Sequence, residues 1–429
     1  TELSPQIGNL VNLRALNISN TFIKTLPAEI GNLSNLESLI AKDSDLLKLP
    51  KEIGRLKKLR LIDISRTSGF GSPIEELTSN LKGVPDEICN AESLETIDFS
   101  SSILERIPEC LNKLSKLHKL NLNSTMLTEL PQSLKGLDSL QSLDLTQTKV
   151  KKLPEDIGHL KSLKMLNLSG TKFLKDLPPE IGGLESLETL TINNSALKSL
   201  PPEIGKLKYL KSIILNKTFL SQIPGEIGNL VNLKSISINN SLLTSLPPGI
   251  GNLAYLEQLD LSANNLQELP SEIGNLISLK TFNLTHNNLN TLPPEIGKLR
   301  SLETLELSQN NLKELPAEIG QLLKLTKLNL PKNNLESIPL EIGKLFNLIE
   351  LDLSGNNLKT FPEIIANLTN LSSASLRNNS FTTLPESMKN SKKIGKISLC
   401  NNNISYSYPN IISLDEPITR EICQPSLNR

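Results

Sequence analysis

The stretch LEQLDLSANNLQELPSEIGNLIS, Leu256–Ser278, decides the fold, because the rest of the chain repeats its spacing. Its leucines at the first, fourth and sixth positions alternate with outward positions such as Asp260, as in a short strand with one buried side. Pro270 removes a backbone donor and ends the extended run. The Glu-Ile-Gly that follows predicts a short helical or 3-10 turn, whose glycine permits a tight exit.

The same unit recurs along nearly the whole chain of 429 residues. Fourteen of the sixteen steps between first leucines are 23 residues long, and Ile394 opens an incomplete seventeenth copy. One such strand cannot bury its apolar side alone, so stacked copies must share one continuous core. The first leucines are Leu13, Leu36, Leu59, Leu94, Leu117, Leu140, Leu163, Leu187, Leu210, Leu233, Leu256, Leu279, Leu302, Leu325, Leu348 and Leu371.

The pattern L-x-x-L-x-L followed by L-P-x-E-I-G-x-L resembles the leucine-rich repeat family. Its back half is similar to the 23-residue subclass found in plant intracellular Ras-group proteins, animal Ras-pathway scaffolds and spirochaete repeat proteins. The resemblance implies an α/β solenoid, a right-handed horseshoe with a parallel β-sheet of about 17 short strands on the concave face. Short helical or 3-10 turns are expected on the convex face.

We expect residues 1–404 to form the solenoid, with a partial repeat at 1–12 and a cap or tail at 405–429. Because Thr1 lies in the back half of a repeat, we also expect the natural chain to begin upstream. An insertion at 68–79 enlarges the third repeat, and loops on a rigid scaffold often carry specificity. A tolerated insertion is the alternative. The candidate partner-binding residues of the loop at 68–79 are Phe70, Ile74, Glu75 and Glu76.

The ninth position of each unit predicts a buried polar ladder that bonds to backbone groups where the strand ends. It holds Thr or Ser in the block 13–255 and Asn in the block 256–404. Because Asn has two donors and an acceptor, whereas Thr has one donor, each Thr should satisfy fewer backbone groups. The main ladder residues are Thr125, Thr148, Thr171, Thr218, Asn264, Asn287, Asn310, Asn333, Asn356 and Asn379.

The position after the ladder is often apolar in the Thr/Ser block and is Asn in much of the other block. We expect it at the lateral edge of the concave face. An exposed apolar row there would anchor a protein partner. Local packing, or two repeat blocks of different ancestry, is the alternative. The row comprises Phe22, Ile103, Met126, Phe219 and Leu242.

The outward strand positions are small, polar and mildly acidic, with no aromatic residues, and suit recognition of a protein through many modest contacts. They argue against a platform on which bases stack. Asp98, Asp144 and Asp260 are the acidic candidates in this column.

The chain carries 45 basic and 45 acidic residues, so no net charge favours nucleic acid. No run of 18 apolar residues predicts membrane insertion. Four cysteines are too few for a disulfide scaffold. Cys89 and Cys110 fall in neighbouring turns, two positions out of register, where the repeat alone would bring them close. Cys400 could pair with Cys423, with two buried free thiols as the alternative.

The three histidines occupy unrelated repeat positions and form no metal spacing with Cys or carboxylates. The sequence holds no phosphate-binding loop, dinucleotide fingerprint or nucleophile elbow. We therefore predict no catalytic residue, no cofactor and no metal site.

These patterns predict a non-catalytic scaffold or recognition module, monomeric, that binds a protein through the concave face and N-terminal lateral edge. One alternative is the substrate-recognition part of a larger enzyme or bacterial effector, and another is an extracellular receptor or adhesion module. The resemblance favours a cytoplasmic setting, with a secreted bacterial or host-directed protein as the alternative.

Overall fold

The structure is a computed structural model that describes residues 2–66, 81–384 and 396–404. The chain divides into two compact units, Thr1–Leu220 and Ser221–Arg429. The expected fold is confirmed, because each unit is an open parallel sheet backed by 3-10 turns. The described residues of the two units together contain 17 strands. The predicted loop at 68–79 and the predicted cap at 405–429 lie outside the described residues.

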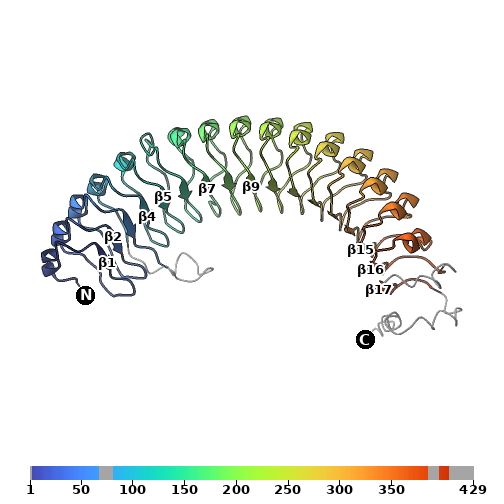
Figure 1. Cartoon of the computed structure of the whole chain (residues 1–429), viewed down its shortest axis with the longest axis horizontal. Coiled ribbons are helices and arrows are strands. Elements are labelled where there is room, and N and C mark those ends of the chain that lie inside the picture. Colours follow the sequence, from blue (N-terminus) through green and yellow to red (C-terminus); the bar gives the residue numbers. More distant parts are fainter. Residues whose placement is uncertain (1, 67–80, 385–395, 405–429) are drawn as a thin grey trace. The chain divides into compact units, whose positions relative to one another are not determined.

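In the N-terminal unit, each strand pairs in parallel with the next strand along the chain, and the 3-10 turns lie on the opposite side (Figure 1). The strands are β1 (Ala15–Asn17), β2 (Ser38–Ile40), β3 (Leu61–Asp63), β4 (Thr96–Asp98), β5 (Lys119–Asn121), β6 (Ser142–Asp144), β7 (Met165–Asn167), β8 (Thr189–Thr191) and β9 (Ser212–Ile214). The turns are η1 (Pro5–Asn9), η2 (Ala28–Asn32), η3 (Lys51–Arg55), η5 (Asp86–Asn90), η6 (Glu109–Lys113), η7 (Glu155–His159), η8 (Pro179–Gly183) and η9 (Pro202–Lys206).

The C-terminal unit repeats this arrangement. Its strands are β10 (Ser235–Ser237), β11 (Gln258–Asp260), β12 (Thr281–Asn283), β13 (Thr304–Glu306), β14 (Lys327–Asn329), β15 (Glu350–Asp352), β16 (Ser373–Ser375) and β17 (Lys396–Ser398). Its turns are η10 (Gly225–Asn229), η11 (Pro248–Asn252), η12 (Ser271–Asn275), η13 (Pro294–Lys298), η14 (Ala317–Gln321), η15 (Leu340–Lys344) and η16 (Glu363–Asn367).

Each strand is only three residues long, and its central residue points into the core. Leu120 of β5 lies opposite Leu143 of β6, and both side chains are buried. Burying one leucine contributes about 1.5–3 kcal/mol. The leucines of each repeat are covered by those of its neighbours, so the core is continuous within a unit.

The 3-10 turns bring neighbouring repeats into close contact. In η14 the Ile319 side chain is buried, and the Leu322 N–H donates to the Ile319 carbonyl at 3.2 Å. A Cβ atom added to Gly297 of η13 would lie 2.8 Å from the Cβ of Glu318 in the next repeat. Only glycine fits there without displacing a neighbour, which explains the glycine of the Glu-Ile-Gly motif.

The asparagine ladder joins neighbouring repeats of the C-terminal unit. Asn310 Nδ2 donates to the carbonyl of Leu307 at 3.1 Å and to that of Leu284, in the preceding repeat, at 2.9 Å. Its Oδ1 accepts from the Leu289 N–H at 3.0 Å, also in the preceding repeat. Asn287 and Asn333 repeat this set of bonds.

The threonine rungs of the N-terminal unit bond differently. The hydroxyl groups of Thr125, Thr148 and Thr171 are buried, and each donates to the carbonyl three residues earlier at 2.6–2.8 Å. These bonds stay within one repeat, whereas each ladder asparagine from Asn264 to Asn379 adds two bonds to the repeat before it.

We predict that Gly297→Ala lowers the free energy of unfolding by about 1–3 kcal/mol, because the new methyl group overpacks the contact with Glu318. Gly225→Ala is the matched control, since an added Cβ there meets no atom within 4 Å. Urea unfolding followed by circular dichroism measures both. Equal stability of the two variants would contradict this explanation of the glycine.

Candidate protein-interaction surface

The outward side of the strands, here called the sheet face, carries the predicted acidic column. Asp98 Oδ1 accepts from the Ser100 N–H at 3.0 Å and from its hydroxyl at 2.6 Å. Asp260 Oδ1 accepts in the same way from Ser262. One oxygen of each carboxylate therefore shapes the turn after its own strand.

The second carboxylate oxygen separates the three acidic candidates. Asp98 Oδ2 accepts from Asn121 Nδ2 at 2.8 Å, and Asp260 Oδ2 accepts from Asn239 Nδ2 at 2.9 Å. For Asp144, the described bonds are the two to Oδ1 from Thr146. Within the part of the chain that the structure describes, Asp144 is thus the candidate that keeps an acceptor oxygen for a partner.

The positions that follow the ladder, here called the ladder edge, carry exposed apolar side chains in the N-terminal unit. Phe22 and Phe219 are 78% and 57% exposed, whereas Ile103 and Met126 are half-buried. Phe173, which follows the ladder-edge residue Lys172, is also exposed. The predicted row is therefore a set of separate aromatic side chains and not a continuous strip.

In the C-terminal unit the ladder edge is mostly polar. Leu242 is exposed there, in the repeat before the first ladder asparagine. Phe70, Ile74, Glu75 and Glu76 lie outside the described residues, so they stay predictions from the sequence.

The positions just before the strands form a mostly charged row, with stretches in which basic and acidic side chains alternate. Arg60 donates from Nε and Nη2 to the two carboxylate oxygens of Glu95, both at 2.9 Å. Lys280 Nζ lies 2.7 Å from Glu257 Oε2. The hydrogen bond from each cation lowers the pKa of its carboxyl group below the ordinary value.

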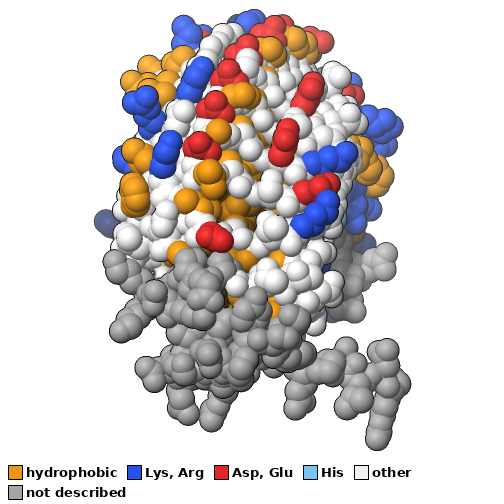
Figure 2. Space-filling view, turned by 90° about the vertical axis from the view of Figure 1, so that its right-hand side faces the viewer, with side chains coloured by type: hydrophobic (Ala, Val, Ile, Leu, Met, Phe, Trp, Pro, Cys, Tyr) orange, Lys and Arg blue, Asp and Glu red, His pale blue; other side chains and the backbone are white. Residues whose placement is uncertain are grey.

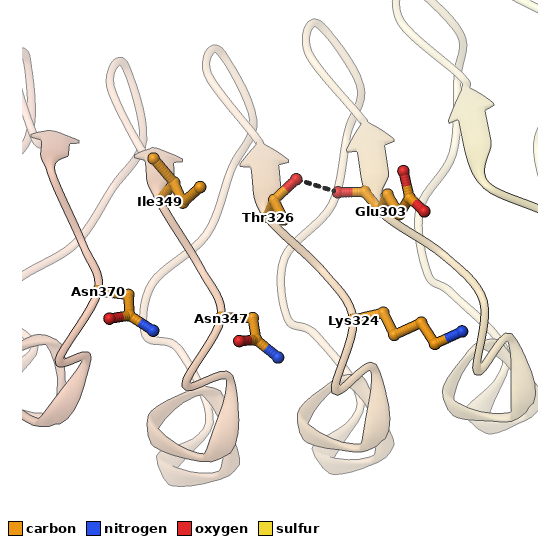
Figure 3. A pocket seen from close by; sticks show the side chains of 6 residues that line it. All are labelled: Glu303, Lys324, Thr326, Asn347, Ile349 and Asn370. Carbon is orange, nitrogen blue, oxygen red and sulfur yellow. Dashed lines mark hydrogen bonds between the residues drawn. The ribbon is translucent and has the colours of Figure 1, made fainter.

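The alternation stops in the C-terminal unit, where a shallow hollow of about 360 Å³ opens (Figure 3). The Thr326 hydroxyl donates to the Glu303 carbonyl at 3.0 Å, and Ile349 takes the next position of the row. Leu323 and Phe346 belong to neighbouring turn exits and are each 56% exposed. The hollow is lined by Glu303, Lys324, Thr326, Asn347, Ile349 and Asn370.

Leu323 and Phe346 belong to a turn-exit row, the positions that follow the last leucine of the Glu-Ile-Gly segment. In the C-terminal unit this row also has Val231 and Ile277 exposed. Figure 2 shows one face of the molecule, on which charged side chains run in rows with hydrophobic side chains between them. The turn-exit row was not predicted from the sequence. Its signal is an apolar residue directly after the last leucine of several Glu-Ile-Gly segments.

Cys89 of η5 and Cys110 of η6 form a disulfide, with Cα atoms 5.9 Å apart. The sequence placed these two residues in neighbouring turns but predicted no bond between them. The other possible pair includes Cys423, which lies outside the described residues.

The described residues contain no group of three or more His, Cys, Asp or Glu side chains that could hold a metal ion. Over the same residues, no helix has the length and apolar character needed to cross a membrane. The site is a surface of polar, charged and scattered apolar side chains, which suits contact with another macromolecule.

Known proteins with this pattern support the fold. Sequence profiles for a leucine-rich repeat region match residues 3–82, 155–240 and 271–334. Profiles for the leucine-rich repeat match residues 115–173, 231–289 and 347–368. Comparison with curated protein sequences gave no significant match.

Solved structures show the same likeness. A leucine-rich repeat protein of Leptospira interrogans is 34% identical, with a TM-score of 0.74 over 93% of this chain and 98% of that chain. The plant peptide hormone receptor RGFR1, solved with RGF2, is 27% identical, with a TM-score of 0.55 over 96% and 79%. The Arabidopsis receptor kinase HAESA is 24% identical, with a TM-score of 0.69 over 94% and 68%, which is a likeness of fold alone.

We predict that Arg60→Gln raises the pKa of Glu95 toward the ordinary value of about 4.3. The lowered pKa means that the pair stabilises the fold above the unfolded-state pKa of Glu95 and loses this effect as pH falls through the folded-state value. An NMR titration with labelled glutamate measures the shift, and Arg14→Gln, which removes a different pair, is the control. An unchanged Glu95 pKa in Arg60→Gln would contradict the bidentate contact.

Proposed function

The chain belongs to the leucine-rich repeat family, and we propose that it is a non-catalytic recognition module that binds a protein through the sheet face and ladder edge of its N-terminal unit. The leucine-rich repeat fold is typical of protein-interaction modules. The observation that carries the proposal is the exposure of Phe22 and Phe219 at the ladder edge, beside a polar sheet face. Exposed aromatic side chains are the usual anchors of protein interfaces.

The sheet face adds specificity to these anchors. Most of its polar groups bond to one another, as the carboxylate of Asp98 does. A partner therefore meets a prearranged polar surface and loses little conformational entropy in ordering it. Asp144, which keeps an acceptor oxygen, is the position where we expect a donor from the partner.

The Cys89–Cys110 disulfide favours an extracellular recognition module over a cytoplasmic scaffold as the more specific role. RGFR1, with which the chain shares 27% identity, was solved in complex with RGF2, and this supports a role in recognising a peptide or protein.

A thiol count under denaturing conditions, on chain isolated from its natural source, separates the two settings. We expect Cys89 and Cys110 to be unreactive until a reductant is added, because they are bonded to each other. Four reactive thiols without reductant would contradict an extracellular role.

Affinity capture tests the binding surface. We predict that Phe22→Ser/Phe219→Ser removes the captured partner, because two anchors worth about 1–2 kcal/mol each weaken binding by tenfold or more. The captured proteins are compared by quantitative mass spectrometry, and the affinity of any enriched protein is then measured with purified chains.

The matched control is Leu323→Ser/Phe346→Ser, which removes two equally exposed side chains from the turn-exit row of the C-terminal unit. It should capture the same proteins as the natural chain. If the control loses the partner and the ladder-edge variant retains it, the partner binds the turn-exit row and the proposed surface is wrong.

A further inference from the structure

The disulfide occupies a place where many of the repeats make one particular contact. The glycine of a Glu-Ile-Gly turn lies against the glutamate that follows it by 21 residues, as Gly31 does with Glu52 and Gly297 with Glu318. A Cβ added to either glycine would lie 2.8 Å from the glutamate Cβ. This is closer than two unbonded groups can approach.

Cys89 and Cys110 take these two positions. Cys89 replaces the glycine in Asp-Glu-Ile-Cys, Cys110 replaces the glutamate of the next turn, and they too are 21 residues apart. The separation of 21 residues is two shorter than the 23-residue period. It is the separation at which residues of neighbouring turns touch, as Gly31 and Glu52 do. A covalent bond lets two side chains share a space that elsewhere requires a glycine.

The two sulfur atoms differ in access. Cys89 is only 1% exposed, whereas Cys110 is half-buried. A hollow of about 360 Å³ opens beside the bond, lined by both cysteines and by Asp86, Glu87, Asn90, Glu109 and Lys113. Cys110 is therefore the more exposed of the two cysteines beside this hollow.

We propose that Cys89–Cys110 is a redox-controlled latch, open to thiol–disulfide exchange with a dithiol, that sets whether turns η5 and η6 are stacked. A thiolate of the dithiol bonds to the Cys110 sulfur as the bond to Cys89 breaks, and Cys89 leaves as a thiolate that takes up a proton. The second thiolate of the dithiol then bonds to the first dithiol sulfur and releases the Cys110 thiolate. The dithiol leaves as a cyclic disulfide, and both cysteines are reduced.

Reduction leaves Cys89 at the glycine position with a thiol that needs a full van der Waals separation from Cys110. The turns must then move apart, because the matching contacts of Gly31 with Glu52 and of Gly297 with Glu318 leave no room for a Cβ at the glycine position. Oxidation restores the short contact, so these two repeats are closely stacked only in an oxidising environment. This latch does not depend on the proposed binding function.

The experiment uses the full chain under native conditions, with millimolar dithiothreitol as the dithiol at neutral pH. Alkylation with iodoacetamide followed by mass spectrometry reports which cysteines are reduced. Hydrogen exchange reports the stacking through the Ala91 N–H, which donates to Ile88, and the Leu114 N–H, which donates to Leu111. We expect both cysteines to become alkylated and both amides to exchange at least tenfold faster.

The control is Cys89→Gly/Cys110→Glu, which restores the ordinary contact and keeps Cys400 and Cys423. We expect slow exchange at Ala91 and Leu114 in this variant, with and without dithiothreitol. The latch is overturned if reduction leaves the exchange of the natural chain unchanged, or if the control speeds up equally on reduction. Failure of dithiothreitol to reduce the folded chain would overturn the access through Cys110.

Discussion

A strand of three residues makes too few hydrogen bonds to persist alone, so each repeat depends on the contact with its neighbour. In the C-terminal unit the ladder asparagines close this contact. Asn310 binds the Leu284 carbonyl and the Leu289 N–H of the preceding repeat, while also binding its own Leu307 carbonyl. One buried side chain thereby satisfies backbone groups on both sides of a repeat boundary, where no regular strand pairing reaches them.

The same boundary has a second constraint on the side of the 3-10 turns. Gly297 and Glu318 approach so closely that no other residue fits at the glycine position without displacement. The ladder holds the repeats together at one side of the core, and the glycine sets how near they come at the other side. A covalent bond replaces this close contact at Cys89 and Cys110. Cys89 lies in the repeat that carries the insertion, and Cys110 lies in the next repeat.

These constraints also explain which surfaces are available to a partner. The carboxylates of Asp98 and Asp260 are used to shape turns, so the sheet face is prearranged and largely satisfied within itself. Apolar exposure differs between the units. Exposed aromatic side chains lie at the ladder edge in the N-terminal unit, as at Phe219, whereas Leu323 and Phe346 are exposed at turn exits of the C-terminal unit and Leu242 at its ladder edge. Whether an apolar side chain is available to a partner thus depends on its position within the repeat as well as on its residue type.

The sequence predicted the features that follow the 23-residue period. Leu259 in a strand, Pro270 at the strand's exit and Asn264 in the ladder all follow from spacing and hydrogen-bonding capacity. Features that depend on the offset between neighbouring turns could not be predicted. The pairing of Cys89 with Cys110 required the knowledge that a glycine meets the residue 21 positions later, and the period does not contain this offset. The hydrogen bonds from Ser100 to Asp98 could have been predicted from the sequence, because a Ser or Thr often stands two residues after the last residue of a strand.

Native-state hydrogen exchange across the whole chain tests the central claim, that side-chain bonds between repeats determine how firmly the repeats are held together. The Leu266, Leu289 and Leu312 N–H groups each donate to the ladder asparagine of the next repeat. Leu104 and Leu127 occupy the same position before threonine rungs. Our account predicts that the first three amides exchange at least tenfold more slowly than the last two. Equal protection of the two groups would contradict it.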